Sequence, residues 1–147
     1  MAEPAVSLHE PGALVRRGPG RLLIAVYALF ALAACARASW QIAFDFQAAP
    51  AAYLLSALAG AIYLMAAVGL SRVGRLSHRF AAICCATELA GVLVVGTLSL
   101  AIPQHFPDDT VWSRFGSGYG FVPLLLPVAG LAWLRHVYRR DRGGQSL

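Results

Sequence analysis

Glu88 has the clearest capacity for chemistry in this sequence, because it is the one charged side chain in an apolar run over residues 80–102. A carboxyl group within a membrane-spanning helix is costly and usually faces the interior of a helix bundle. Two roles stay open: a proton or cation site, or a hydrogen-bonded side chain that locks helices together, with Tyr63 as its partner. Because lost hydration disfavours the charged form, we expect Glu88 to be protonated at neutral pH.

Arg37 and Tyr63 are the other polar candidates within apolar runs. A helical rise of ~1.5 Å per residue, counted from the basic flanks, gives Glu88 and Tyr63 depths of about 12–13 Å. The same count gives Arg37 and Tyr119 depths of about 22–24 Å, near the outer interface. The Arg37 side chain can extend to that interface. We interpret Arg37 as an interface anchor, with a substrate site as the alternative.

Other chemistry has little support. All four His residues fall in tails, loops or helix ends, so no pair can ligate a haem within the membrane. The sequence has no CxxC, P-loop, GxSxG or HExxH motif. His105 could meet a metal ion together with Asp108 and Asp109, but three such residues in a loop are more often solvated. We therefore expect no enzymatic activity, no bound metal and no cofactor.

The elements that position these residues are four apolar runs. Of the 147 residues, 59% are hydrophobic and 13% are charged, so much of this short chain must be solvated by a bilayer. Each run is close to the ~20 residues that span a membrane as a helix. The sequence predicts an all-α integral membrane four-helix bundle over residues 21–138. Its helices are expected at about 22–44, 48–70, 80–102 and 116–134.

Charge along the chain predicts the topology. The net charge of +5 comes from Arg alone, since the sequence has no Lys. Residues 71–79 and the segment after 134 are rich in Arg, whereas the loops 44–47 and 103–115 carry Asp. This alternation predicts that both termini are cytoplasmic. We expect residues 1–20 to be a disordered cytoplasmic tail and residues 139–147 a basic one. Arg residues at the ends of apolar runs indicate a lipid bilayer as partner and not nucleic acid.

Four residues are candidate interface anchors. The loop 103–115 can form a short helix in the headgroup layer, but we favour the interpretation of an ordinary loop with interfacial aromatic residues. Aromatic and arginine side chains both favour the membrane surface. The expected anchors are Trp112, Tyr119, Arg135 and Arg139.

The stretch Leu32–Cys35 fits a bacterial lipoprotein cleavage box. Cleavage there would remove the first helix and leave a lipid on Cys35. The apolar run continues beyond Cys35 to Phe44, whereas mature lipoproteins usually begin with a polar tether. We therefore expect the first helix to be retained.

Three stretches resemble a family of small four-helix actinobacterial integral membrane proteins with no assigned activity. They are APAAYLLSALAGAIYL, ELAGVLVVGTLSL and TVWSRFGSGYGFVPLLLPVAGLAWLR, and the resemblance covers residues 20–137. It implies four helices and a multi-pass location in the bacterial plasma membrane, and it adds no catalytic residues.

Small residues recur every fourth position in the second and third runs, which favours close helix packing. The function we expect is therefore that of a non-enzymatic accessory or scaffold subunit acting through helix packing. Its partner would be another membrane protein or a second copy of the chain. The alternative is a proton-coupled small transporter, or a component of an oligomeric channel, that uses Glu88.

Overall fold

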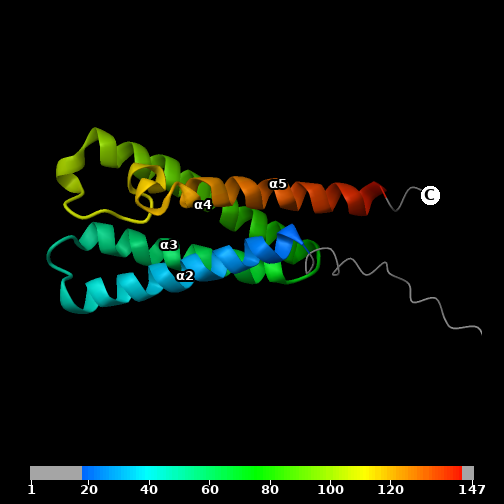
Figure 1. Ribbon diagram of the computed structural model, residues 1–147, viewed down its shortest axis with the longest axis horizontal. Coiled ribbons are helices and arrows are strands. Elements are labelled where there is room, and N and C mark those ends of the chain that lie inside the picture. Colours follow the sequence, from blue (N-terminus) through cyan, green and yellow to red (C-terminus); the bar gives the residue numbers. More distant parts are fainter. Residues whose placement is uncertain (1–17, 144–147) are drawn as a thin grey trace, which may run out of the picture.

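The computed structural model describes residues 18–143. Four long helices and two short 3₁₀ segments account for most of this range, which contains no strand. They are α2 (Pro19–Phe44), α3 (Pro50–Ser71), α4 (Arg75–Ala101), η1 (Pro103–His105), η2 (Ser113–Tyr119) and α5 (Val122–Gly143). The long helices run lengthwise through the molecule (Figure 1). Residues 1–17 and 144–147, which include most of the predicted N-terminal tail, lie outside the described range.

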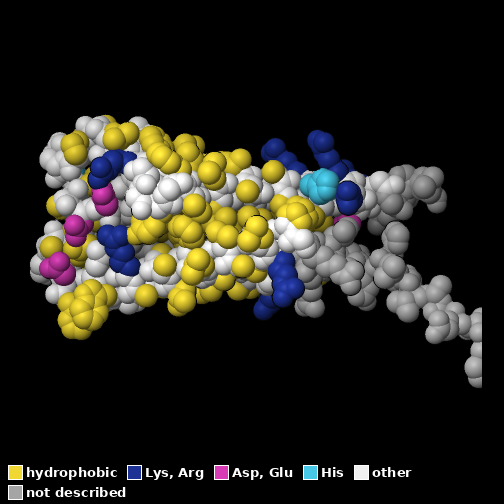
Figure 2. Space-filling model, viewed as in Figure 1, with side chains coloured by type: hydrophobic (Ala, Val, Ile, Leu, Met, Phe, Trp, Pro, Cys, Tyr) yellow, Lys and Arg dark blue, Asp and Glu magenta, His cyan; other side chains and the backbone are white. Residues whose placement is uncertain are grey.

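The lengths and apolar character of the helices are those of a multi-pass membrane protein. Helices α2, α3 and α4 are each long and apolar enough to cross a membrane, with mean hydropathies of 2.0, 1.9 and 1.9. Segment η2 and helix α5 form a fourth candidate span with a 98° bend. Large apolar side chains cover the middle of the molecule, between two ends that carry the charges (Figure 2). Soluble proteins rarely expose such continuous apolar surface. The prediction of an all-helical chain with several membrane-crossing helices is confirmed.

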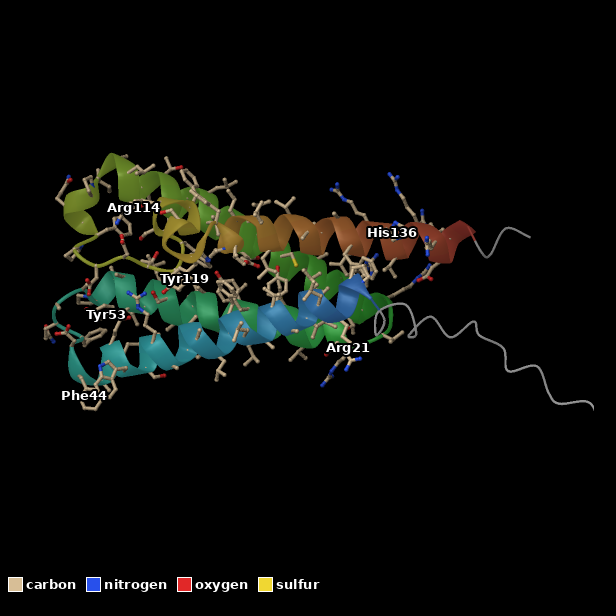
Figure 3. All side chains as sticks on the ribbon, in the orientation of Figure 1. Arg21, Phe44, Tyr53, Arg114, Tyr119 and His136 are labelled. Atoms are coloured by element: carbon tan, nitrogen blue, oxygen red, sulfur yellow. The ribbon has the colours of Figure 1, made fainter. Side chains whose placement is uncertain are left out.

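The two ends of the molecule differ in charge (Figures 2 and 3). One end, here called the basic end, carries Arg21, the α3–α4 connection and the C-terminal part of α5. The other, here called the loop end, carries the α2–α3 connection and the segment between α4 and α5.

The first three predicted helices agree with the structure to within five residues, whereas the fourth does not. It was expected over residues 116–134, but α5 begins at Val122 and continues to Gly143. Positive φ angles at Gly116, Gly120 and Phe121 prevent a continuous α-helix from residue 116 to Val122. Residues 139–143, expected in the basic tail, instead continue α5. Basic side chains in the last helical turn favour this extension because they complement the helix dipole.

Close helix approaches occur at glycines. A Cβ atom on Gly60 of α3 would lie 2.7 Å from the sulfur of Cys35 on α2. A Cβ atom on Gly69 would lie 3.1 Å from Ala81 of α4. Small residues at such points let the helix backbones pack tightly where no hydrophobic driving force acts between helices. These contacts hold α2, α3 and α4 together around the buried polar residues.

Candidate functional site

A buried polar cluster lies at the centre of the bundle, and we call it the central cluster. It comprises Tyr27 of α2, Tyr63 of α3, Cys85 and Glu88 of α4, and Trp112 of the loop end. Glu88, Tyr27 and Tyr63 are all 0% exposed. The sequence predicted that Glu88 lies on a helix, but it did not predict the residues around Glu88, which come from four different segments of the chain.

Tyr27 is the partner of Glu88. Its hydroxyl donates a hydrogen bond to Oε2 of Glu88 at 2.7 Å and lies 3.4 Å from the sulfur of Cys85. This bond connects α2 directly to α4 across the core. The other carboxyl oxygen, Oε1, is buried and has no hydrogen-bond partner among the described residues. The one ion pair within residues 18–143 involves other residues, so no described cation neutralises Glu88.

The predicted hydrogen bond between Glu88 and Tyr63 is absent from the described interactions. The Tyr63 hydroxyl instead accepts a hydrogen bond from the indole nitrogen of Trp112 at 3.0 Å. Its ring lies beside that of Tyr27, with 6.3 Å between the ring centroids. A count of helical rise gave Tyr63 the better depth, but it does not say which way each side chain points. In the structure the Tyr27 hydroxyl points to the carboxyl group and the Tyr63 hydroxyl to Trp112.

Trp112, which was expected as an interface anchor, is buried inside the bundle. It is 2% exposed, and its ring packs on Gly91, where a Cβ atom would come within 2.7 Å. The Thr110 side chain accepts a hydrogen bond from the Trp112 backbone nitrogen, and Ser113 accepts one from Thr110. These bonds form a tight turn that directs the indole inward. In the sequence, Gly91, one turn beyond Glu88, is the residue that could have indicated this close approach.

The remainder of the loop also packs onto α4. A Cβ atom on Gly96 would lie 2.6 Å from the Phe115 ring. The Arg114 backbone nitrogen donates to the hydroxyl of Ser99 at 2.8 Å. Arg114 and Phe115 adopt positive φ angles of 50° and 59°, which are uncommon for residues with side chains. In place of the surface helix that the sequence allowed as an alternative, the structure has a short 3₁₀ segment folded against the bundle.

Arg37 links α2 to this loop at an exposed position. Its guanidinium donates to the Tyr119 hydroxyl and to the backbone carbonyl of Asp109. Asp109 also pairs with the exposed side chain of Arg114. These residues border an open polar pocket of about 400 Å³ at the loop end. Tyr119 is partly buried, and both Arg37 and Tyr119 hold the loop in place through their mutual hydrogen bond.

The loop acids are used in protein contacts. Asp108 accepts a hydrogen bond from Tyr53, a buried α3 residue that sequence reasoning missed. Asp109 is paired with Arg114. Among residues 18–143, no group of three or more potential metal ligands is present. The labelled Tyr53, Arg114 and Tyr119 all lie in the half of the molecule toward the loop end (Figure 3).

The two predicted anchors on α5, Arg135 and Arg139, are exposed at the basic end. They lie at the end of the molecule opposite the loop-end pocket. Near them, α4 and α5 border a second and larger cavity.

Comparisons with protein-family models, curated proteins and solved structures return no match. The resemblance to small actinobacterial membrane proteins therefore stays a prediction. Function has to be derived from the geometry of the central cluster and the two ends.

Proposed function

We propose that this chain is a non-enzymatic membrane scaffold or accessory subunit of the bacterial plasma membrane. Its partner would be another membrane protein or a second copy of the chain. The observation that carries the proposal is the enclosure of Glu88, which is 0% exposed and hydrogen-bonded to Tyr27. The buried carboxyl group of the bundle thus ties α2 to α4.

The packing around Glu88 supports this role. A transporter or enzyme needs a route by which water or substrate reaches the reacting group. Around Glu88, the rings of Tyr27, Tyr63 and Trp112 are almost completely buried. The close contact between Trp112 and Gly91 covers the side toward the loop end. A fixed, tightly packed interior suits a protein that presents an unchanging outer surface to partners.

The membrane topology belongs to the same proposal. Arginines concentrate at the basic end, and three acidic residues, Asp45, Asp108 and Asp109, lie in the connections of the loop end. By the positive-inside rule, the basic end would be cytoplasmic and the loop end external. Counting η2 with α5 as one span, the chain would cross the membrane four times with both termini inside.

A second candidate rests on the unpartnered Oε1 atom of Glu88. A buried oxygen without a hydrogen bond is costly, and such groups in membrane helices often mark proton pathways. Loss or gain of a proton at Glu88 would change its bond with Tyr27 and so the contact between α2 and α4. This favours a proton-coupled small transporter, or a channel component, as the alternative function.

Proton flux into vesicles separates the two functions. Wild type, Glu88→Gln and a matched acid-to-amide control, Asp141→Asn, would be reconstituted with a pH-sensitive dye inside. A scaffold gives no flux above empty vesicles for any of the three proteins. Flux in wild type and in Asp141→Asn that is lost in Glu88→Gln would establish the transporter function instead.

Partner association is the matching positive measurement. Wild type and Glu88→Gln, isolated from native membranes in mild detergent, should retain the same membrane protein at the same molar ratio. Self-association at a fixed stoichiometry would equally support a scaffold. Recovery of only monomeric chain from both would contradict the proposal.

A further inference from the structure

We propose that the groove between α4 and α5 at the basic end binds one anionic phospholipid. The lipid phosphate would lie at the basic rim of the groove, and one acyl chain would lie along its apolar wall. The groove has a volume of about 610 Å³. This inference goes beyond the scaffold role and requires only that the chain lies in a membrane.

On both α4 and α5, the residues that line the groove are basic or aromatic toward the basic end and apolar toward the middle of the molecule. Its rim consists of basic and aromatic side chains: Arg75, His78, Arg79, Arg135, Tyr138 and Arg142. Its wall consists of apolar ones: Ala82, Ile83, Ala86, Leu131 and Leu134. The distance along α4 from the first rim residue to the last wall residue is about 16 Å at the usual helical rise. A phospholipid has the same order, with a charged phosphate at one end and an apolar chain beneath it.

The beginning of α4 favours an anion at the rim. Helix N-termini carry partial positive charge and backbone N–H groups without helical partners. Gly74 provides no side-chain cap there, and the first turn contains no acidic residue. Arg75 and Arg79 add further positive charge, which is unfavourable for the helix unless an anion is nearby. Among the described residues, Arg75, Arg79 and Arg135 have no acidic partner.

Aromatic contacts organise the rim before any lipid binds. The Tyr138 ring lies 5.6 Å from the His78 ring, which connects α5 to α4. The Arg142 guanidinium lies over the same Tyr138 ring, 4.8 Å from its centroid. Tyrosine is enriched at the level of lipid headgroups. Fixing these side chains in advance lowers the entropy lost when an anion binds.

The charge distribution favours a lipid over a second copy of the chain. None of the described residues that line the groove is acidic. Asp45, Asp108 and Asp109 all belong to the opposite end, and Glu88 is buried, so Asp141 is the one described acid that a parallel neighbouring copy could bring near the rim, against four arginines that line it. A soluble phosphate would leave the apolar wall uncovered. Anionic lipids attract clustered basic residues at the membrane surface and bind in basic pockets between membrane helices.

Native mass spectrometry of the detergent-purified full chain tests the proposal, with added phosphatidylglycerol or phosphatidylcholine as the probe. Wild type should retain one phosphatidylglycerol molecule and no phosphatidylcholine. The double variant Arg79→Gln/Arg135→Gln should bind phosphatidylglycerol about tenfold or more weakly, since each basic group near an anionic lipid contributes measurably. The matched control Arg72→Gln/Arg139→Gln removes the same charge at the same end outside the groove and should bind within about twofold of wild type.

A third variant tests the apolar wall. Ala86→Phe places a ring in the exposed apolar part of the groove and should weaken lipid binding while the protein stays folded, as judged by circular dichroism and elution volume. Unchanged binding in Ala86→Phe would overturn the acyl-chain site. Equal losses in the two double variants would reduce the groove to a general basic surface, and displacement of the lipid by inorganic phosphate would show that no lipid is needed. None of these outcomes depends on Glu88, so they leave the scaffold proposal to its own tests.

Discussion

The central cluster and the α4–α5 groove use ionisable side chains in opposite ways. At the centre, one carboxyl group is fully enclosed and bonded to a tyrosine of another helix. In the groove, Arg75, Arg79 and Arg135 are exposed around a cavity and have no acidic partner among the described residues. An enclosed group contributes to one fixed structure, whereas open groups of one sign are available to a ligand. Together, the two proposals assign ligand binding to an end of the bundle and structural support to its centre.

The test of membrane topology has the largest expected effect, because each reporter fusion is either cytoplasmic or external. If the basic end is cytoplasmic, reporter fusions within residues 71–79 and after Gly143 should report the cytoplasm. A fusion at Gln104 should report the external side, because the loop end lies across the membrane. An external reading at Gly143 would break the four-span arrangement and place the groove in the other leaflet.

Gly91→Ala should cause the largest loss of stability among single substitutions at the centre. The added Cβ atom would lie 2.7 Å from the Trp112 ring, and Trp112 is almost fully buried. Overpacking of this kind costs about 1–3 kcal/mol. Unfolding in mixed detergent micelles measures the cost. The matched control is Gly118→Ala, since nothing lies within 4 Å of its Cβ position, and it should change stability little.

Tyr27→Phe should lower the free energy of unfolding by less than Gly91→Ala does. The substitution removes the donor to Glu88 and keeps the ring, at an expected cost of about 1 kcal/mol in a membrane bundle. Tyr138→Phe removes a hydroxyl at the basic end and should be nearly neutral. If Tyr27→Phe is as stable as wild type, the bond between α2 and α4 does not hold the bundle together.

The helices could be predicted from sequence because apolar length and charge determine them locally. A run of about 20 apolar residues can satisfy its backbone in a bilayer only as a helix. Arg37 and Tyr119 are hydrogen-bonded in the structure, but the depth count that assigned them to one layer extended the fourth helix to residue 116, whereas α5 begins at Val122.

The loop end could not be predicted, because its conformation depends on tertiary contacts. Arg114, Phe115 and Phe121 adopt positive φ angles, and nothing about arginine or phenylalanine in a sequence predicts such angles. Phe115 and Trp112 pack on glycines of α4, and the Arg114 backbone nitrogen is bonded to Ser99 of the same helix. A tryptophan in a loop between membrane helices usually lies at the interface, so composition alone gave the wrong surroundings for this one.

The most direct test of the enclosed centre is the protonation state of Glu88 in the intact protein. Glu88 is 0% exposed and has no described cationic partner, so we expect a neutral carboxyl group at pH 7. Infrared difference spectra of wild type against Glu88→Gln measure it. The account predicts a protonated carboxyl C=O band in wild type that is absent from Glu88→Gln, with both proteins equally folded. Only an ionised carboxylate band at pH 7 would contradict the account, because a cation or water-filled cavity would then lie beside Glu88.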